Sequence, residues 1–300
     1  MELKIIHRKD LDNERWDALV ASSKEVSFFS YTWYLDAIAE NWCVISNDSY
    51  SIGVALPYTE RMGQQILYTP IFVSYLELLG DKASADFNKC QELILANFKH
   101  IEVEFKESIL GPNYEVFVSQ LSDGTGKRKS QVNRMLNKAR RFGLEVKHSS
   151  DWKSVFEIIR SELNNKFSGM SYTSLKRLAD MYLQANNEGR LLSLEVSKDG
   201  VIQGGVICFI DEAQIFYSKG AVLEEARNNG GMYLAIDAAI SSAREKELLF
   251  DFGGSRVEGV RRFNHNFGGE DFEYYSYRIN NGLFWFKWLR AIKNKWFKKS

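Results

Sequence analysis

Residues 217–254 read YSKGAVLEEARNNGGMYLAIDAAISSAREKELLFDFGG, and this stretch decides the fold. Its apolar pattern predicts a strand over 213–222, a helix over 231–247 and a buried strand over 248–252. A glycine-rich turn joins the first strand to the helix. A strand, a helix and a second strand in this order are typical of an α/β fold, which we therefore predict for the second half of the chain.

The turn is the first candidate binding site. It consists of Arg227, Asn228, Asn229, Gly230, Gly231 and Met232. Backbone amides at the N-terminus of a helix can hold a phosphate or a carboxylate, and Arg227 can add a charge-assisted contact. The alternative is that asparagine and glycine serve only the turn geometry. The position of the turn directly after a central strand favours anion binding.

Outward from this segment, the chain shows the same kind of unit twice. The second half has helices at 151–167 and 173–187, and a hairpin whose strands, 191–196 and 201–210, meet at Asp199-Gly200. A last strand is expected at 270–279. The first half has a looser order of helices (12–22, from 30, 84–100) and strands (42–46, 51–60, 65–68, 101–105, 114–121). We expect three segments: an N-terminal domain at 1–126, a C-terminal domain at 127–282 and a terminal helix at 283–300.

Charge and composition describe an ordinary globular protein. The 300 residues carry a formal net charge of +0, and 45% of them are hydrophobic. No apolar run approaches the roughly 20 residues that span a bilayer, and the N-terminus lacks the apolar region of a signal peptide. Three distant cysteines and four scattered histidines predict neither a disulfide frame nor a metal site. A cytoplasmic location is expected, with peripheral contact at the inner face of the membrane as an open alternative.

Cations gather in two segments that contain no acidic residue. One is the expected helix at 127–143, and the other is 284–299, where tryptophans and lysines would lie on opposite sides of a helix. The first could meet tRNA phosphates or be a solvated helix. The second suits an anionic membrane surface, or it packs its tryptophans on the domain and leaves its lysines in water.

Several of these segments resemble a known family. The turn at 227–232 is similar to the pyrophosphate-binding turn of GNAT acyltransferases. The downstream pattern resembles the FemABX-like branch of that superfamily: Phe250-Asp251-Phe252-Gly253-Gly254-Ser255, then Gly259, Phe263 and Phe267-Gly268-Gly269-Glu270. The basic helix at 127–143 matches this branch as well. The resemblance implies tandem GNAT-like domains, each a mixed and mostly antiparallel sheet flanked by helices.

The resemblance also implies a reaction. An acyl group would move from acyl-CoA, used as a co-substrate without a metal, to an amine on a small molecule or cell-wall precursor, in cell-envelope or polysaccharide metabolism. Two alternatives stay open: Fem-type transfer from aminoacyl-tRNA to a peptidoglycan precursor, and a degenerate GNAT fold that serves as a membrane-associated binding module. Two departures argue against the peptidoglycan reaction. The chain has no room for a long helical arm, and Asn264 replaces a lysine that often follows the phenylalanine at 263.

Amine acylation needs a proton acceptor and groups that stabilise the oxyanion. Asp251, at the end of the central buried strand, is the candidate base, or it caps the turn at Gly253. Tyr217 and Ser218 are candidates to protonate the leaving group, or they are packing residues. The candidate acceptor-binding residues are Arg256, Arg262 and His265, with Arg261 beside them; surface charge and a solvated turn are their alternatives.

Overall fold

The computed structural model describes residues 2–23, 28–82, 85–166, 172–254 and 257–281. The chain forms two compact units. Unit 1 comprises Met1–Ser23, Phe29–Phe117 and Tyr274–Ser300, and unit 2 comprises Lys24–Phe28 and Val118–Glu273. Strands β7 (Glu115–Ser122) and β13 (Glu270–Asn280) each contribute residues to both units. The predicted domain limits at 126/127 and 282/283 stay predictions, and the predicted terminal helix at 283–300 lies outside the described residues.

Unit 1 is built on a sheet in the order β1-β2-β3-β4-β6-β13, with β5 paired to β3. All these pairs are antiparallel except β4 with β6. The strands are β1 Lys4–His7, β2 Asn41–Ser46, β3 Ile52–Arg61, β4 Gln64–Tyr68, β5 Leu78–Gly80 and β6 His100–Phe105.

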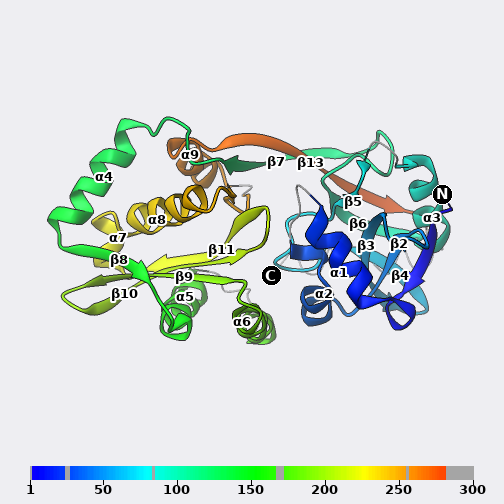
Figure 1. Ribbon diagram of the computed structural model, residues 1–300, viewed down its shortest axis with the longest axis horizontal. Helices are drawn as coiled ribbons and strands as arrows, with labels where there is room; N and C mark the ends of the chain where they lie inside the picture. Colours follow the sequence, from blue (N-terminus) through cyan, green and yellow to red (C-terminus); the bar gives the residue numbers. More distant parts are fainter. Residues whose placement is uncertain (1, 24–27, 83–84, 167–171, 255–256, 282–300) are drawn as a thin grey trace, which may run out of the picture. The chain divides into compact units, whose positions relative to one another are not determined.

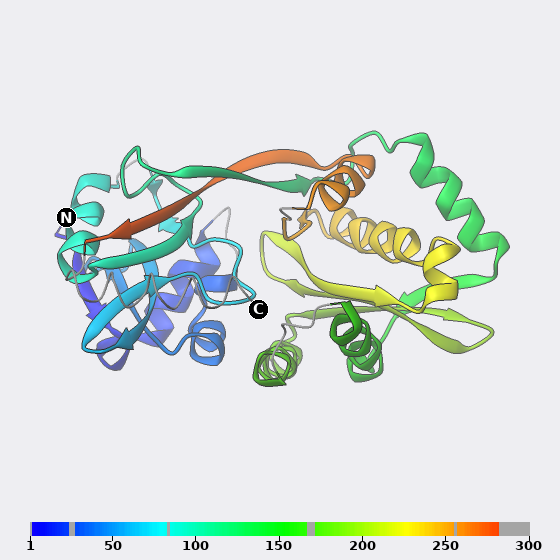
Figure 2. The same ribbon diagram turned by 180° about the vertical axis from the view of Figure 1, so that it is seen from behind.

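The helices of unit 1 lie on both faces of this sheet (Figures 1 and 2). They are α1 Asn13–Ser22, α2 Thr32–Ile38 and α3 Phe87–Asn97, with short 3₁₀ turns at Arg8–Asp10 and Phe28–Ser30. Val54 and Leu56 share a buried cluster with Ile94 of α3. Gly53 points to the other face, where a Cβ atom would lie 2.7 Å from Trp16 of α1. Successive side chains of β3 point to opposite faces of the sheet, so one face of the strand packs against α3 and the other against α1.

Unit 2 has a sheet in the order β7-β12-β11-β10-β9-β8. Only β11 and β12 are parallel, because the helix α8 connects them; the other pairs are antiparallel. The strands are β8 Leu144–His148, β9 Leu191–Lys198, β10 Val201–Ile210, β11 Gln214–Val222 and β12 Leu249–Asp251. The predicted hairpin is confirmed, with Asp199 and Gly200 at positive φ between β9 and β10.

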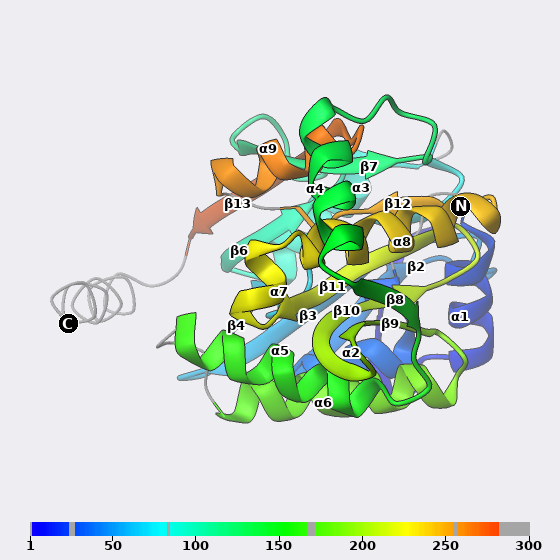
Figure 3. The ribbon, with the colours of Figure 1, turned by 90° about the vertical axis from the view of Figure 1, so that its left-hand side faces the viewer.

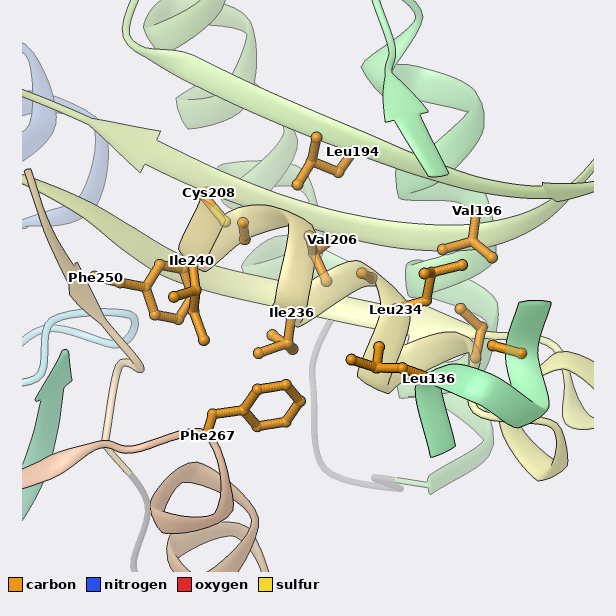
Figure 4. Close-up of a cluster of buried hydrophobic side chains, with 14 of the residues drawn as sticks. Leu136, Leu194, Val196, Val206, Cys208, Leu234, Ile236, Ile240, Phe250 and Phe267 are labelled. Atoms are coloured by element: carbon orange, nitrogen blue, oxygen red, sulfur yellow. The ribbon is translucent and has the colours of Figure 1, made fainter. Parts of the chain in front are cut away.

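Two helical layers cover the sheet of unit 2. Helix α8 lies on one face, and α5 and α6 lie on the other (Figures 1 and 3). Leu234, Ile236 and Ile240 of α8 pack against strand residues such as Val206 and Phe250 (Figure 4). The helices are α4 Ser130–Arg141, α5 Trp152–Lys166, α6 Tyr172–Asn187, α7 Glu224–Asn228, α8 Gly231–Glu245 and α9 Glu258–Asn266.

Some elements of unit 2 were not predicted. Helices α7 and α9 occupy stretches expected to be turns, and His265 lies on α9 instead of in a loop. Both helices are short, so neither has enough apolar positions to show a helical period. Helix α4 matches the predicted basic helix, and Gly143 follows its end at a φ of +82°. Among the residues of the structure that are described, no helix has the length and apolar character to cross a membrane.

Candidate functional site

The strand β11 changes its surroundings halfway along its length. Its first part pairs with β12, and Phe216 opposite Asp251 is the last pair because β12 ends there. Strand β11 continues to Val222. On the other edge, Ile207 lies opposite Lys219 and Cys208 lies opposite Tyr217, so Ser218 is an extra residue. A β-bulge of this kind redirects side chains and is common beside functional sites.

The predicted anion-binding turn does not follow this strand directly, because the short helix α7 lies between Val222 and the glycines. Gly230 has a φ of +90°, and Gly231 begins α8 without a side-chain cap. A Cβ atom on Gly230 would lie 2.5 Å from the carbonyl oxygen of Met135 on α4. Lys138 of α4 donates to the carbonyl oxygen of Asn228 at 2.7 Å. Helix α4 therefore holds one side of the turn, and the need for glycine is tertiary as well as local.

Arg227 makes an ion pair that the sequence did not indicate. Its Nη1 atom donates to Oε2 of Glu162 on α5 at 2.8 Å. The arginine side chain is 39% exposed, so this pair contributes little to stability, and the guanidinium can exchange partners. Asn228, Asn229 and Met232 complete the predicted turn; Met232 packs partly against the core.

Asp251 is completely buried at the end of β12. Its Oδ1 atom accepts a hydrogen bond from the backbone amide of Gly253 at 2.7 Å. Gly253 and Gly254 both have positive φ, and the chain there packs against Tyr217 and Ser119. The geometry of a turn cap is therefore present, whereas the catalytic role of Asp251 stays a prediction.

Tyr217 and Ser218 lie on opposite faces of the sheet. Tyr217 packs against the cluster beneath α8, and burial raises its pKa above the ordinary tyrosine value. The Ser218 hydroxyl forms a 2.9 Å hydrogen bond with the hydroxyl of Tyr182 on α6. Tyr182 is fully buried, and burial raises its pKa as well. Sequence reasoning missed Tyr182 because nothing in the sequence relates positions 182 and 218.

His265 belongs to a hydrogen-bonded group within unit 2. Its Nδ1 atom lies 2.9 Å from the carbonyl oxygen of Gly269, and its Nε2 atom lies 3.1 Å from Asp271. Arg261 and Gln120 also donate to Asp271. Burial opposes ionisation of Asp271, but these hydrogen bonds outweigh it and hold its pKa below the usual range.

The predicted acceptor-binding residues therefore differ in their surroundings. His265 and Arg261 are engaged with Asp271, and Arg262 is exposed on α9. Arg256 lies outside the described residues.

Cys43, Cys90 and Cys208 are free and buried. Across the described ranges, no group of three or more His, Cys, Asp or Glu side chains could hold a metal ion.

Asn264 connects α9 to strand β7. Its side chain is 3% exposed and donates to Oε1 of Gln120, itself fully buried on β7, at 2.9 Å. Asn264→Ala should lower the free energy of unfolding by about 1–3 kcal/mol, because it leaves a buried acceptor unsatisfied. Urea denaturation measures this. Val260→Ala on the same helix, where the side chain is 42% exposed, should change stability by less than about 0.5 kcal/mol; equal losses in both variants would contradict the prediction.

Comparisons with known proteins identify the fold. A scan of protein-family models and a search of curated protein sequences find no significant match. Among solved structures, FemX matches at a TM-score of 0.66 and 12% identity, over 92% of this chain and 98% of its own. The fold is FemABX-like. L-PGS from Bacillus licheniformis matches at a TM-score of 0.56 and 14% identity, over 91% of this chain and 93% of that one.

A conserved protein of unknown function from Bacteroides thetaiotaomicron VPI-5482 has the same FemABX-like fold. It matches at a TM-score of 0.62 and 14% identity, over 91% of this chain and 100% of its own. The predicted resemblance to the FemABX-like GNAT branch is thus confirmed at the level of the fold. So is the predicted α/β class with mostly antiparallel sheets.

Proposed function

We propose that this protein is an N-acyltransferase that moves an acyl group from an acyl-CoA donor to an amine. The observation that carries the proposal is the arrangement of β11 and α8. Strand β11 carries a bulge and extends beyond its parallel neighbour β12. The short helix α7 follows it, and then a glycine turn begins α8, whose first amides have no side-chain cap. Such a helix start suits the pyrophosphate of a CoA-type donor.

The acceptor proposed is a small-molecule or cell-wall-precursor amine, in cell-envelope or polysaccharide metabolism. The similarity to FemX supports this class of acceptor. One feature departs from the family pattern: position 264, where a lysine is often found, holds a buried asparagine. Peripheral membrane contact through 284–299 involves residues outside those described. The proposal includes a cytoplasmic location.

The donor site can be tested through Arg227 and its partner. We expect acetyl-CoA to bind saturably in calorimetry, and Arg227→Ala to weaken the affinity about 10-fold or more, because a charge-assisted contact with phosphate is lost. Glu162→Gln is the matched variant: it removes the competing charge at 2.8 Å and keeps the arginine, so affinity should stay equal or rise. Unchanged affinity in Arg227→Ala would contradict the role of this turn.

A second candidate is transfer from aminoacyl-tRNA, as in Fem-type enzymes. Helix α4 favours it, since Arg134, Lys138, Arg140 and Arg141 are exposed there and its sequence has no acidic residue. Arg128, in contrast, forms a 2.7 Å ion pair with Asp237 of α8 and holds α4 in place. If acetyl-CoA and CoA do not bind, aminoacyl-tRNA binding with a steep salt dependence would support this candidate. Binding of neither would favour a non-catalytic module.

A further inference from the structure

We propose that Lys219 is the general base of unit 2, whose amine takes the proton that the acceptor nitrogen loses as it attacks the donor. This assignment rests on the proposed acyl transfer and names a residue that the sequence did not single out. It comes from three features of β11: the position of Lys219 along the strand, the face from which it projects, and its electrostatic surroundings.

Lys219 lies on the part of β11 that continues past the end of β12. The last pair between the two strands is Phe216 with Asp251, three residues before Lys219. The strand then runs to Val222, and the short helix α7 separates it from the glycine turn that begins α8. Lys219 is therefore located on the part of β11 that no longer has β12 beside it.

The bulge determines the face from which Lys219 projects. Val206 and Cys208 of β10 belong to the cluster beneath α8, so Ile207 between them faces α5 and α6. Lys219 is opposite Ile207 and shares that face. Ser218, the extra residue, bonds Tyr182 on α6 and so faces the same way. Two consecutive side chains thus leave β11 on one face, which a regular strand does not allow.

The surroundings of Lys219 favour its neutral form. Burial lowers its pKa from 10.5 to about 8, and its Nζ atom donates to the carbonyl oxygen of Ser218 at 3.0 Å. Glu195 of β9, on the same face as Lys219, pairs with Lys147 at 3.3 Å. Tyr217, Tyr182 and Cys208 have pKa values raised by burial, Glu162 on α5 pairs with Arg227, and Asp251 on β12 accepts the Gly253 amide.

The acceptor nitrogen attacks the carbonyl carbon of the acyl thioester, a C–N bond forms, and one proton passes from nitrogen to Nζ of Lys219. The C–S bond breaks, and its electron pair leaves with sulfur as the CoA thiolate. The Lys219 ammonium then returns its proton to the thiolate or to water. The products are an amide and free CoA, and the lysine is regenerated.

The test uses the full chain with acetyl-CoA as donor and ethanolamine, glucosamine and lysine as acceptors. Lys219→Met and Lys219→Arg should each lower kcat about 100-fold or more, because neither supplies a neutral amine. Acetyl-CoA affinity should change little. In the wild type, kcat should fall as pH drops below about 8 and level off above it, since only the neutral lysine accepts a proton. That limb should be absent from the residual activity of Lys219→Met.

Lys246→Met, an exposed lysine at the end of α8, is the control and should keep the wild-type rate and pH profile. A Lys219→Met variant with wild-type kcat and pH profile would overturn the assignment and leave the proposed function standing. If the wild type neither binds nor uses acetyl-CoA, the proposed function fails instead.

An NMR titration, which does not depend on turnover, tests the protonation state of Lys219 directly. In protein carrying ¹³C at lysine Cε, the resonance missing from Lys219→Met identifies this residue. Titration of that resonance near pH 8 supports a neutral amine in the working range. Titration at the ordinary lysine value of 10.5 overturns the assignment.

Discussion

Replacing Gly230 by alanine should destabilise unit 2 by about 2–5 kcal/mol. The residue has a φ of +90°, which costs an alanine about 1–2 kcal/mol. The added Cβ atom would also lie 2.5 Å from the carbonyl oxygen of Met135, and overpacking of this kind typically costs about 1–3 kcal/mol. Urea denaturation followed by circular dichroism measures the loss, and acetyl-CoA calorimetry reports whether the turn survives.

Gly143→Ala is the matched control for this prediction. Gly143 has a similar φ of +82°, but nothing lies within 4 Å of the position its Cβ atom would take. Only the backbone strain applies, so the loss should be about 1–2 kcal/mol. If the two variants lose equal stability, the contact between α4 and the turn does not constrain Gly230.

Replacing Asp251 should separate its two possible roles. Asp251→Ala removes the acceptor for the Gly253 amide at 2.7 Å and should lower the free energy of unfolding by about 1–3 kcal/mol. Asp251→Asn keeps an acceptor oxygen of the same shape, so we expect a smaller loss and a kcat within a few-fold of the wild type. Urea denaturation and steady-state kinetics on both variants measure these effects.

The Asp251→Asn variant distinguishes a turn cap from a catalytic carboxylate. If it folds with nearly wild-type stability but loses about 100-fold or more in kcat, the carboxylate takes part in the chemistry as a base or an amine-positioning group. The assignment of the base to Lys219 would then need revision. Retained activity leaves Asp251 as the cap that fixes the turn after β12.

The sequence alone determined most elements and the type of fold. Helix α1 was predicted over 12–22 with Trp16, Leu19 and Val20 on one face, because helical periodicity is a local property; the structure buries these three side chains. The hairpin at Asp199-Gly200 was predicted for the same reason: a turn with positive φ selects its residues within a few positions. The glycines before α8 likewise marked the start of that helix.

What only the tertiary structure decided lies in contacts between distant positions. The bulge at Ser218 depends on pairing with β10, Arg227 meets Glu162, and the burial of Asn264 depends on Gln120. No local pattern records such partners, since each side chain is compatible with several environments. The same holds for Lys219. In the sequence it cannot be told from a surface lysine, and only the fold places it on a buried face, where removal of water lowers its pKa.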